Sequence, residues 1–192
     1  MAYLIAGLII FLGVHSVRMV AQSWRTRTQA QIGKGPWKAL FALVSLLGLG
    51  LIVWGFGLVR QQPVHLWSPP VGMRHVASLL TLISFVLLVA AYVPGNDIRA
   101  RVRHPMVLGV ELWALAHLLT NGNLAHVVLF GSFLAWAMLN FNAARRRDYA
   151  SCARYPRGKA GATGITVALG VALWIAFVLW LHGLLIGVRP LG

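Results

Sequence analysis

The stretch Trp37–Val59, WKALFALVSLLGLGLIVWGFGLV, carries one charged residue, Lys38, which lies near its start. An α-helix rises ~1.5 Å per residue, so about 20 apolar residues cross the hydrocarbon core of a bilayer. The stretch is long enough and apolar enough for one crossing. It therefore predicts a membrane-spanning helix.

Five further apolar runs accompany this stretch: Ala2 to about Val20, His75–Val93, Pro105–Thr120, Leu124–Phe141 and Thr163–Val188. The chain of 192 residues is 59% hydrophobic and 10% charged, whereas a soluble domain carries roughly a quarter charged residues. We expect an all-α fold, a polytopic bundle of about six transmembrane helices that forms a single domain over residues 1–192. The fourth run is short for a span, and the turn Asn121-Gly122-Asn123 joins it tightly to the fifth.

Seventeen Lys and Arg residues against three Asp and Glu residues give a net charge of +14. The positive residues cluster in the first, third and fifth loops between the apolar runs: Arg25, Arg27, Lys34 and Lys38; Arg99, Arg101 and Arg103; and Arg145, Arg146, Arg147, Arg154, Arg157 and Lys159. The second loop has only Arg60 and Arg74, the fourth has none, and the C-terminal tail has only Arg189. Because positive loops remain on the cytoplasmic side, we expect both termini to be periplasmic. This pattern also argues against nucleic-acid binding, since the charges follow the loops.

Cys152 is the single cysteine and lies in the basic fifth loop, so it can form no intramolecular disulfide. We expect a free thiol on a reducing face of the membrane. The first apolar run has neither a leading Lys or Arg nor a clear small-residue cleavage site. It is expected to be a retained helix rather than a removed signal peptide.

His15 lies within the first apolar run, and Arg18 follows it three residues later on the same helix face. A polar ring in the membrane usually faces the bundle interior with a partner, and imidazole is well suited to bind a metal or haem iron. Two interpretations remain open. Either His15 binds iron and Arg18 meets a haem propionate, or His15 bonds a neighbour while Arg18 extends to the lipid phosphates.

Glu111 lies in the fourth apolar run and is the only carboxylate expected within the membrane, because we place Asp97 and Asp148 in loops. A membrane carboxylate is costly unless it is paired or protonated. Counted along the helices, Glu111 lies at a depth similar to that of His15, so we expect it to meet Arg18 or His15. This contact could be structural, or it could orient a ligand histidine.

His117 lies deeper in the same run, at about 17 Å from its cytoplasmic end. His126 lies across the Asn121-Gly122-Asn123 turn at nearly the same depth. A pair formed by His117 and His126 is therefore a geometric alternative to a pair formed by His15 and His117.

The segments GVHSVR (residues 13–18) and RHPMVLGVELWALAH (residues 103–117) resemble the NnrU family. These are bacterial integral membrane proteins linked to nitrite and nitric oxide reduction. The resemblance covers nearly the whole chain, and the combination of an early membrane HSxR with RHP and a later LAH is fairly specific.

The same pattern is similar to 15-cis-zeta-carotene isomerase, a relative that holds haem b between two histidines. By position, those ligands correspond to His15 and His117. The isomerase has a cysteine where this chain has Ala114, so a thiolate role is not expected. The resemblance implies a multi-pass protein of the bacterial inner membrane that binds haem b and acts in nitric oxide or nitrite metabolism, with Arg18 on a propionate and Glu111 orienting a ligand. A haem-dependent carotenoid isomerase with a lipophilic substrate, and an accessory protein without cofactor, are alternatives.

The element Arg103-His104-Pro105 also resembles the RHPxYxG motif of integral membrane methyltransferases such as isoprenylcysteine carboxyl methyltransferase. That resemblance implies that Arg103 and His104 help to bind S-adenosylmethionine. Val107 stands where the motif has tyrosine, and Asp148 is the only acid after Glu111. We therefore rank this function below haem binding.

The charge distribution makes a testable prediction about topology. A reporter fused after Gly192 should report a periplasmic location, and one inserted near Gly158 should report a cytoplasmic location, because the fifth loop carries the most positive charge. Paired alkaline phosphatase and green fluorescent protein fusions measure both. The reverse pattern would overturn the charge argument.

Overall fold

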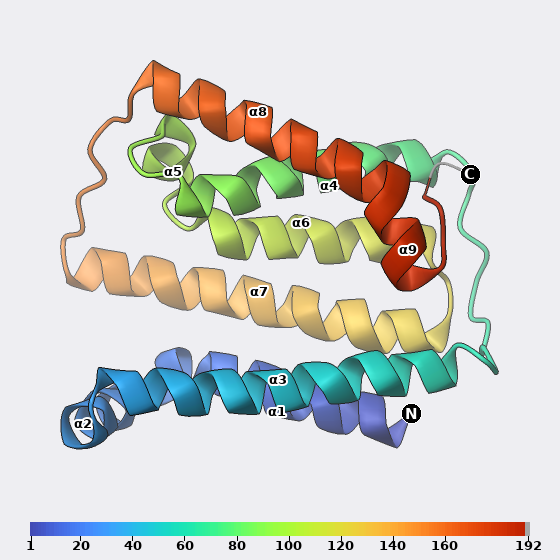
Figure 1. Ribbon diagram of the computed structural model, residues 1–192, viewed down its shortest axis with the longest axis horizontal. Helices are drawn as coiled ribbons and strands as arrows, with labels where there is room; N and C mark the ends of the chain where they lie inside the picture. Colours follow the sequence, from blue (N-terminus) through green and yellow to red (C-terminus); the bar gives the residue numbers. More distant parts are fainter. Residues whose placement is uncertain (191–192) are drawn as a thin grey trace. The chain divides into compact units, whose positions relative to one another are not determined.

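The computed structural model describes residues 1–190 as a set of helices with their connecting segments (Figure 1). In chain order they are α1 (Ala2–Val20), α2 (Gln22–Ile32), α3 (Lys34–Val59), α4 (Met73–Tyr92), α5 (Asp97–Val102), α6 (Pro105–Thr120), α7 (Leu124–Ala150), α8 (Ala160–Ala176), the π-helical turn η1 (Phe177–Leu181) and α9 (His182–Ile186). The predicted all-α class is confirmed. Among residues 1–190, five segments are long and apolar enough to cross a membrane, namely α1, α3, α4, α7 and the continuous stretch Ala160–Ile186, and α6 is a shorter apolar helix.

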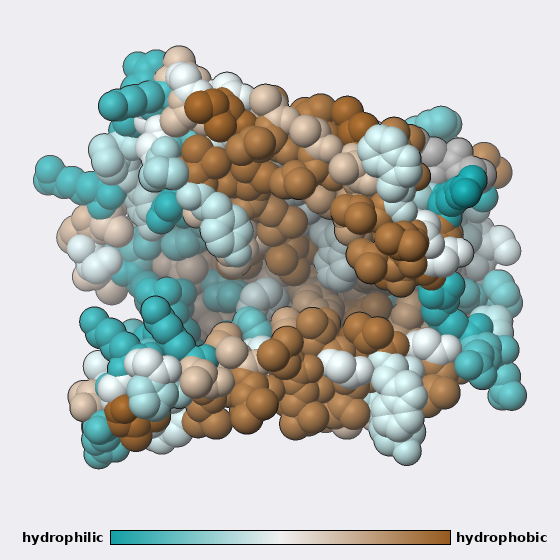
Figure 2. Space-filling model, viewed as in Figure 1, coloured by the Kyte–Doolittle hydropathy of each residue, from teal (hydrophilic) through white to brown (hydrophobic). Residues whose placement is uncertain are grey.

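The outward-facing surface of these helices is apolar. In α3, the side chains of Leu43 and Val53 are 67% and 65% exposed, which would be unfavourable over a whole helix in water. Hydrophobic residues cover the middle of the helices and hydrophilic residues gather at their ends (Figure 2). This distribution is that of helices solvated by lipid in the middle and by water at the ends.

The chain divides into two compact units. Unit 1 comprises residues 1–68 and 122–136, and unit 2 comprises residues 69–121 and the chain from residue 137 onward. Helix α7 contributes its first half to unit 1 and its second half to unit 2.

In unit 1, α1 packs along α3 through glycines that let the two backbones touch. A Cβ atom on Gly7 would lie 2.6 Å from the backbone nitrogen of Ile52, and one on Gly48 would lie 2.8 Å from that of Phe11. Gly55 meets the backbone of Leu4 in the same way. Lipid offers no hydrophobic driving force between helices, so close packing of this kind is what associates them.

Not every glycine of the long helices packs in this way. A Cβ on Gly50, Gly57 or Gly131 would meet nothing within 4 Å. The helix rotation turns these three away from any neighbour.

In unit 2, α4 packs against both α6 and α8. The buried hydroxyl of Ser84 donates to the carbonyl of Gly109 on α6 at 2.7 Å. The indole nitrogen of Trp174 on α8 donates to the hydroxyl of Thr81 at 3.1 Å. These contacts between helices fix α4 in the middle of the unit.

The turn between α4 and α5 is fastened to the start of α8. Asn96 is 2% exposed, and its side-chain oxygen caps α5 by accepting from the backbone nitrogen of Arg99 at 2.7 Å. The backbone nitrogen of Asp97 donates to the hydroxyl of Thr163 at 2.9 Å, and the Asp97 carboxylate accepts from the backbone nitrogen of Gly158 at 2.8 Å. One end of unit 2 is therefore held by hydrogen bonds between distant segments.

The two acids expected in loops lie in helices. Asp97 is the first residue of α5, where a negative charge is favourable at a helix N-terminus. Helix α7 was expected to end at Phe141 but continues to Ala150, so that Asp148 lies in its last turn. The segment after Phe141 is rich in alanine and arginine, which favour helix. Because it lies outside the bilayer, its polar residues do not end α7.

Other helix boundaries also differ from the expectation. The first loop contains α2, a polar helix whose sequence has no apolar period to reveal it. The last span begins at Ala160 and is interrupted by the π-helical turn η1 before it ends at Ile186. Gly187 takes a left-handed conformation with φ +77° and terminates the helix there.

The glycine contacts predict a difference between two neighbouring residues of α3. Gly48→Ala should lower the free energy of unfolding by about 1–3 kcal/mol, because its Cβ would collide with α1. Gly50→Ala is the matched control and should leave stability unchanged or raise it by up to about 1 kcal/mol through helix propensity. Thermal unfolding in mild detergent compares them, and equal effects would contradict the packing.

Candidate functional site

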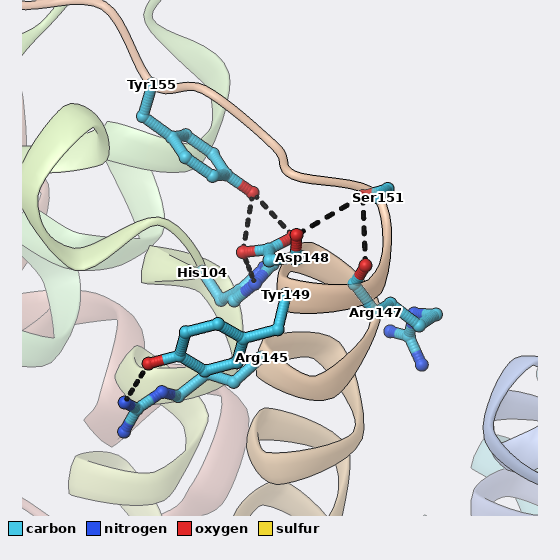
Figure 3. Close-up of polar contacts among 7 residues, drawn as sticks. All are labelled: His104, Arg145, Arg147, Asp148, Tyr149, Ser151 and Tyr155. Carbon is cyan, nitrogen blue, oxygen red and sulfur yellow. Dashed lines mark hydrogen bonds and ion pairs between the residues drawn. The ribbon is translucent and has the colours of Figure 1, made fainter.

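His104, Asp148 and Tyr155 form a polar cluster in unit 2 (Figure 3). The Nε2 atom of His104 lies 2.9 Å from a carboxylate oxygen of Asp148, and the two side chains are 20% and 12% exposed. The Tyr155 hydroxyl donates to both oxygens of the same carboxylate, at 3.0 Å each. One carboxylate therefore joins the N-terminus of α6, the C-terminus of α7 and the segment that follows α7.

A strained turn positions His104. Arg103 has φ +65° and ψ −48°, and the backbone nitrogen of His104 donates to the carbonyl of Val102 at 2.7 Å. This is a γ-turn of the rare form with positive φ, which costs about 1–3 kcal/mol for a residue with a side chain. Pro105 then starts α6 at its first turn, where the missing N–H leaves no bond unmade.

The chain after α7 turns back so that Tyr155 covers Asp148. The backbone nitrogen of Ala153 donates to the carbonyl of Asp148 at 3.0 Å, which starts the reversal. The guanidinium of Arg103 lies 5.7 Å from the centre of the Tyr155 ring, a cation–π distance. The rings of His104 and Tyr155 are nearly perpendicular, with 6.3 Å between their centres.

Burial raises the pKa of the Tyr155 phenol, the hydrogen bond to Asp148 and the negative charge of Asp148 raise it further, and the charges of Arg103 and Arg99 oppose them. The phenol therefore remains protonated at neutral pH and donates to Asp148. Since an ionised carboxylate only accepts, His104 presents Nε2–H to it. A neutral His104 ring then carries its lone pair on Nδ1, the arrangement of a histidine that a carboxylate orients for proton transfer.

His15 lies in α1 of unit 1 and has one ring nitrogen fixed. Its Nδ1 lies 2.7 Å from the carbonyl of Phe11, four residues earlier. A carbonyl only accepts, so Nδ1 is the donor and the lone pair of the neutral ring is on Nε2. The ring stacks on Phe11 at 4.2 Å between centres and meets the rings of Phe41 and Trp136 edge-on at 5.0 and 6.2 Å.

His117 lies in α6 of unit 2 and repeats this arrangement. Its Nδ1 lies 2.8 Å from the carbonyl of Trp113, again four residues earlier. The lone pair of the neutral ring is therefore also on Nε2. The two histidines that the sequence singles out thus have the same tautomer for the same local reason.

His126, the alternative ligand, differs from both. Its Nδ1 is buried and has no hydrogen-bond partner among residues 1–190. The ring packs against aromatic neighbours, with Phe56 edge-on at 5.2 Å and Phe130 stacked at 6.0 Å. No hydrogen bond to that nitrogen selects a tautomer of this ring.

The remaining candidates occupy both units. Arg18 is exposed near the end of α1 in unit 1, and Glu111 is partly buried in α6 of unit 2. Their pairing would join the two units and stays a prediction. Arg103 and His104, in contrast, lie together around Tyr155.

Sequence reasoning missed Asp148 and Tyr155 as members of a site. The signal was the segment Arg145-Arg146-Arg147-Asp148-Tyr149, in which a lone acid follows three arginines. An acid in such a run is expected to pair with its arginine neighbours, yet here Asp148 accepts from His104 and Tyr155 instead.

The helices are long and apolar, and their polar side chains bond to carbonyls of the same helix. A polar cluster lies at one end of unit 2. These features define a multi-pass α-helical membrane protein. Within that class, the chain belongs to the NnrU family. The sequence model of the NnrU protein matches residues 3–190, nearly the whole chain. No curated protein and no solved structure matches it significantly.

The cluster predicts that the Tyr155 hydroxyl stabilises the fold. Tyr155→Phe should lower the free energy of unfolding by about 1 kcal/mol, because Asp148 loses a hydrogen-bond donor. In an Asp148→Asn background the same change should cost less, since the partners are coupled. The matched control is Tyr149→Phe, which removes an exposed hydroxyl that accepts from Arg145 at the surface. Chemical denaturation in detergent measures all four variants, and an equal cost of Tyr155→Phe in the wild-type and Asp148→Asn backgrounds would refute the coupling.

Proposed function

We propose that this protein of the NnrU family binds haem b through His15 and His117 and acts in nitric oxide or nitrite metabolism in a bacterial inner membrane. The observation that carries the proposal is the shared state of the two rings. Each donates Nδ1–H to the carbonyl four residues earlier, which leaves the lone pair of the neutral ring on Nε2. Histidines that bind a metal typically donate their other ring N–H in this way, which fixes the tautomer and raises ligand basicity.

The surroundings of His15 also suit a haem. Phe11 and Phe41 form an apolar wall beside the ring, and apolar walls exclude water from an iron site. The Nε1–H of Trp136 is buried without an acceptor among residues 1–190, so it can donate to a group such as a propionate. Arg18, exposed three residues after His15, can pair with a propionate at the membrane edge.

The choice of His15 over His126 as partner of His117 rests on the same hydrogen bonds. Nδ1 of His15 is fixed by Phe11, whereas Nδ1 of His126 is buried without a partner in the described part of the chain. A ligand histidine needs its second nitrogen satisfied. His15 and His117 meet that requirement.

Haem iron supplies one-electron chemistry when it is bound. The protein's own contribution is to fix the tautomer of the two imidazoles, with the lone pair of each neutral ring on Nε2. Ala114 is fully buried one turn before His117, where a methyl group can take no part in covalent chemistry. The link to nitric oxide and nitrite rests on the resemblance to the family.

Haem content tests the proposal. The protein expressed under haem-replete conditions and purified in mild detergent should show a Soret band and a pyridine haemochrome spectrum of b type. His15→Gly and His117→Gly should each remove most of the haem, and added imidazole should restore part of the Soret band if the fold persists. His126→Ala is the matched control and should retain haem. Arg18→Met should weaken haem retention more than Glu111→Leu does.

A wild-type protein without a Soret band would refute the proposal. Binding of S-adenosylmethionine that depends on Arg103 and His104, in a protein without haem, would favour the methyltransferase function instead. Isothermal titration with S-adenosylmethionine on wild type and on Arg103→Gln distinguishes the two.

A further inference from the structure

One end of unit 2 carries a basic surface built from three segments. In and beside α5, Arg99, Arg101 and Arg103 are exposed. In the last turns of α7, Arg145 and Arg146 are exposed.

The third segment is the connection from α7 to α8, where Arg154, Arg157 and Lys159 are exposed. The contact of Tyr155 with Asp148 and that of Gly158 with Asp97 hold this connection against the other two segments.

We propose that this basic surface binds the phosphate headgroups of anionic phospholipids in preference to zwitterionic ones.

The acids at this end are already engaged by other groups. The Asp97 carboxylate accepts from the backbone nitrogen of Gly158 at 2.8 Å. The Asp148 carboxylate accepts from His104 and from Tyr155. The positive charge of the surface is therefore left largely for an anion from outside the chain.

Two exposed tyrosines mark the level of the membrane interface at this end. Tyr92 is the last residue of α4 and is 74% exposed, and Tyr149 in the last turn of α7 is 66% exposed. Tyrosine favours the headgroup region of a bilayer. The hydroxyl of Tyr149 accepts from the guanidinium of Arg145 at 3.3 Å, which places that cation at headgroup level.

An apolar stripe continues from the basic surface along α8. Helix α8 begins directly after Lys159. Ile165, Leu169 and Leu173 follow at intervals of four residues on one helix face, and they are 57%, 48% and 49% exposed. In Figure 2, hydrophobic residues cover the middle of α8 and hydrophilic residues gather at its start.

The basic surface and the apolar stripe along α8 together indicate the class of partner. A nucleic acid or an acidic peptide matches the cations but not the apolar stripe. A phospholipid with an anionic headgroup matches both, since its phosphate meets the arginines while its acyl chains lie along α8. Basic clusters next to a membrane helix attract anionic lipid by about fivefold in affinity for each residue near the surface.

The test compares lipids with identical acyl chains. The full-length protein, purified in neutral detergent, is offered equimolar phosphatidylglycerol and phosphatidylcholine, and the retained lipids are counted by native mass spectrometry. The wild type should retain phosphatidylglycerol in clear excess. Arg145→Gln with Arg146→Gln should lower that preference by roughly tenfold or more.

The matched control removes the same charge from the other end of unit 2. Arg74 lies at the start of α4 and Arg189 follows α9, and both are exposed. Arg74→Gln with Arg189→Gln should leave the lipid preference unchanged. Thermal unfolding without added lipid checks that both double variants fold as the wild type does.

Three results would overturn the proposal: equal retention of the two lipids by the wild type, an equal loss of preference in both double variants, or displacement of bound lipid by millimolar glycerol 3-phosphate. The last result would show a site for soluble phosphate rather than for lipid. Loss of the preference in high salt is expected, because exposed charges are screened.

Discussion

A backbone N–H or C=O group finds no water in the hydrocarbon of a bilayer, so it must be bonded within the protein. That constraint makes helices of the apolar segments, and it extends to the polar side chains they carry. Ser16, Ser45 and Ser132 each donate to the carbonyl four residues earlier, at 2.6–2.7 Å. His15 and His117 do the same through Nδ1. The tautomer on which haem ligation would depend thus follows from the same requirement that shapes the helices.

The constraint also decides how helices associate. Because lipid tails are as apolar as the helix surfaces, close backbone contact and hydrogen bonds between helices replace hydrophobic burial. Gly7 and Gly48 provide the first of these between α1 and α3. The bond from Ser84 to Gly109 and that from Trp174 to Thr81 provide the second within unit 2. Each unit therefore depends on a few small or polar residues at its helix contacts.

Outside the apolar region, contacts with water and charged groups stabilise the ends of the helices. Asp148 stabilises one end of unit 2 by accepting from two side chains that come from different segments. The positive φ of Arg103 costs free energy there, and the bond from His104 to Asp148 helps to offset it. A strained turn next to a polar cluster is typical of a functional site. The polar cluster of His104, Asp148 and Tyr155 is therefore a second candidate site, separate from the membrane histidines.

The sequence by itself determined the class of fold and the position of the main helices. Hydropathy predicted α1 and α6 to the residue, since apolar length is a property of adjacent residues. It missed α2 and the polar end of α7, because a helix in water needs no apolar run. Sequence also singled out His15 and His117, as polar rings in apolar surroundings. Only the tertiary structure decided that Gly48 packs while Gly50 does not, and that His104 meets Asp148 across 44 residues of chain. Those outcomes depend on helix rotation and on a turn with positive φ, which no spacing along the chain encodes.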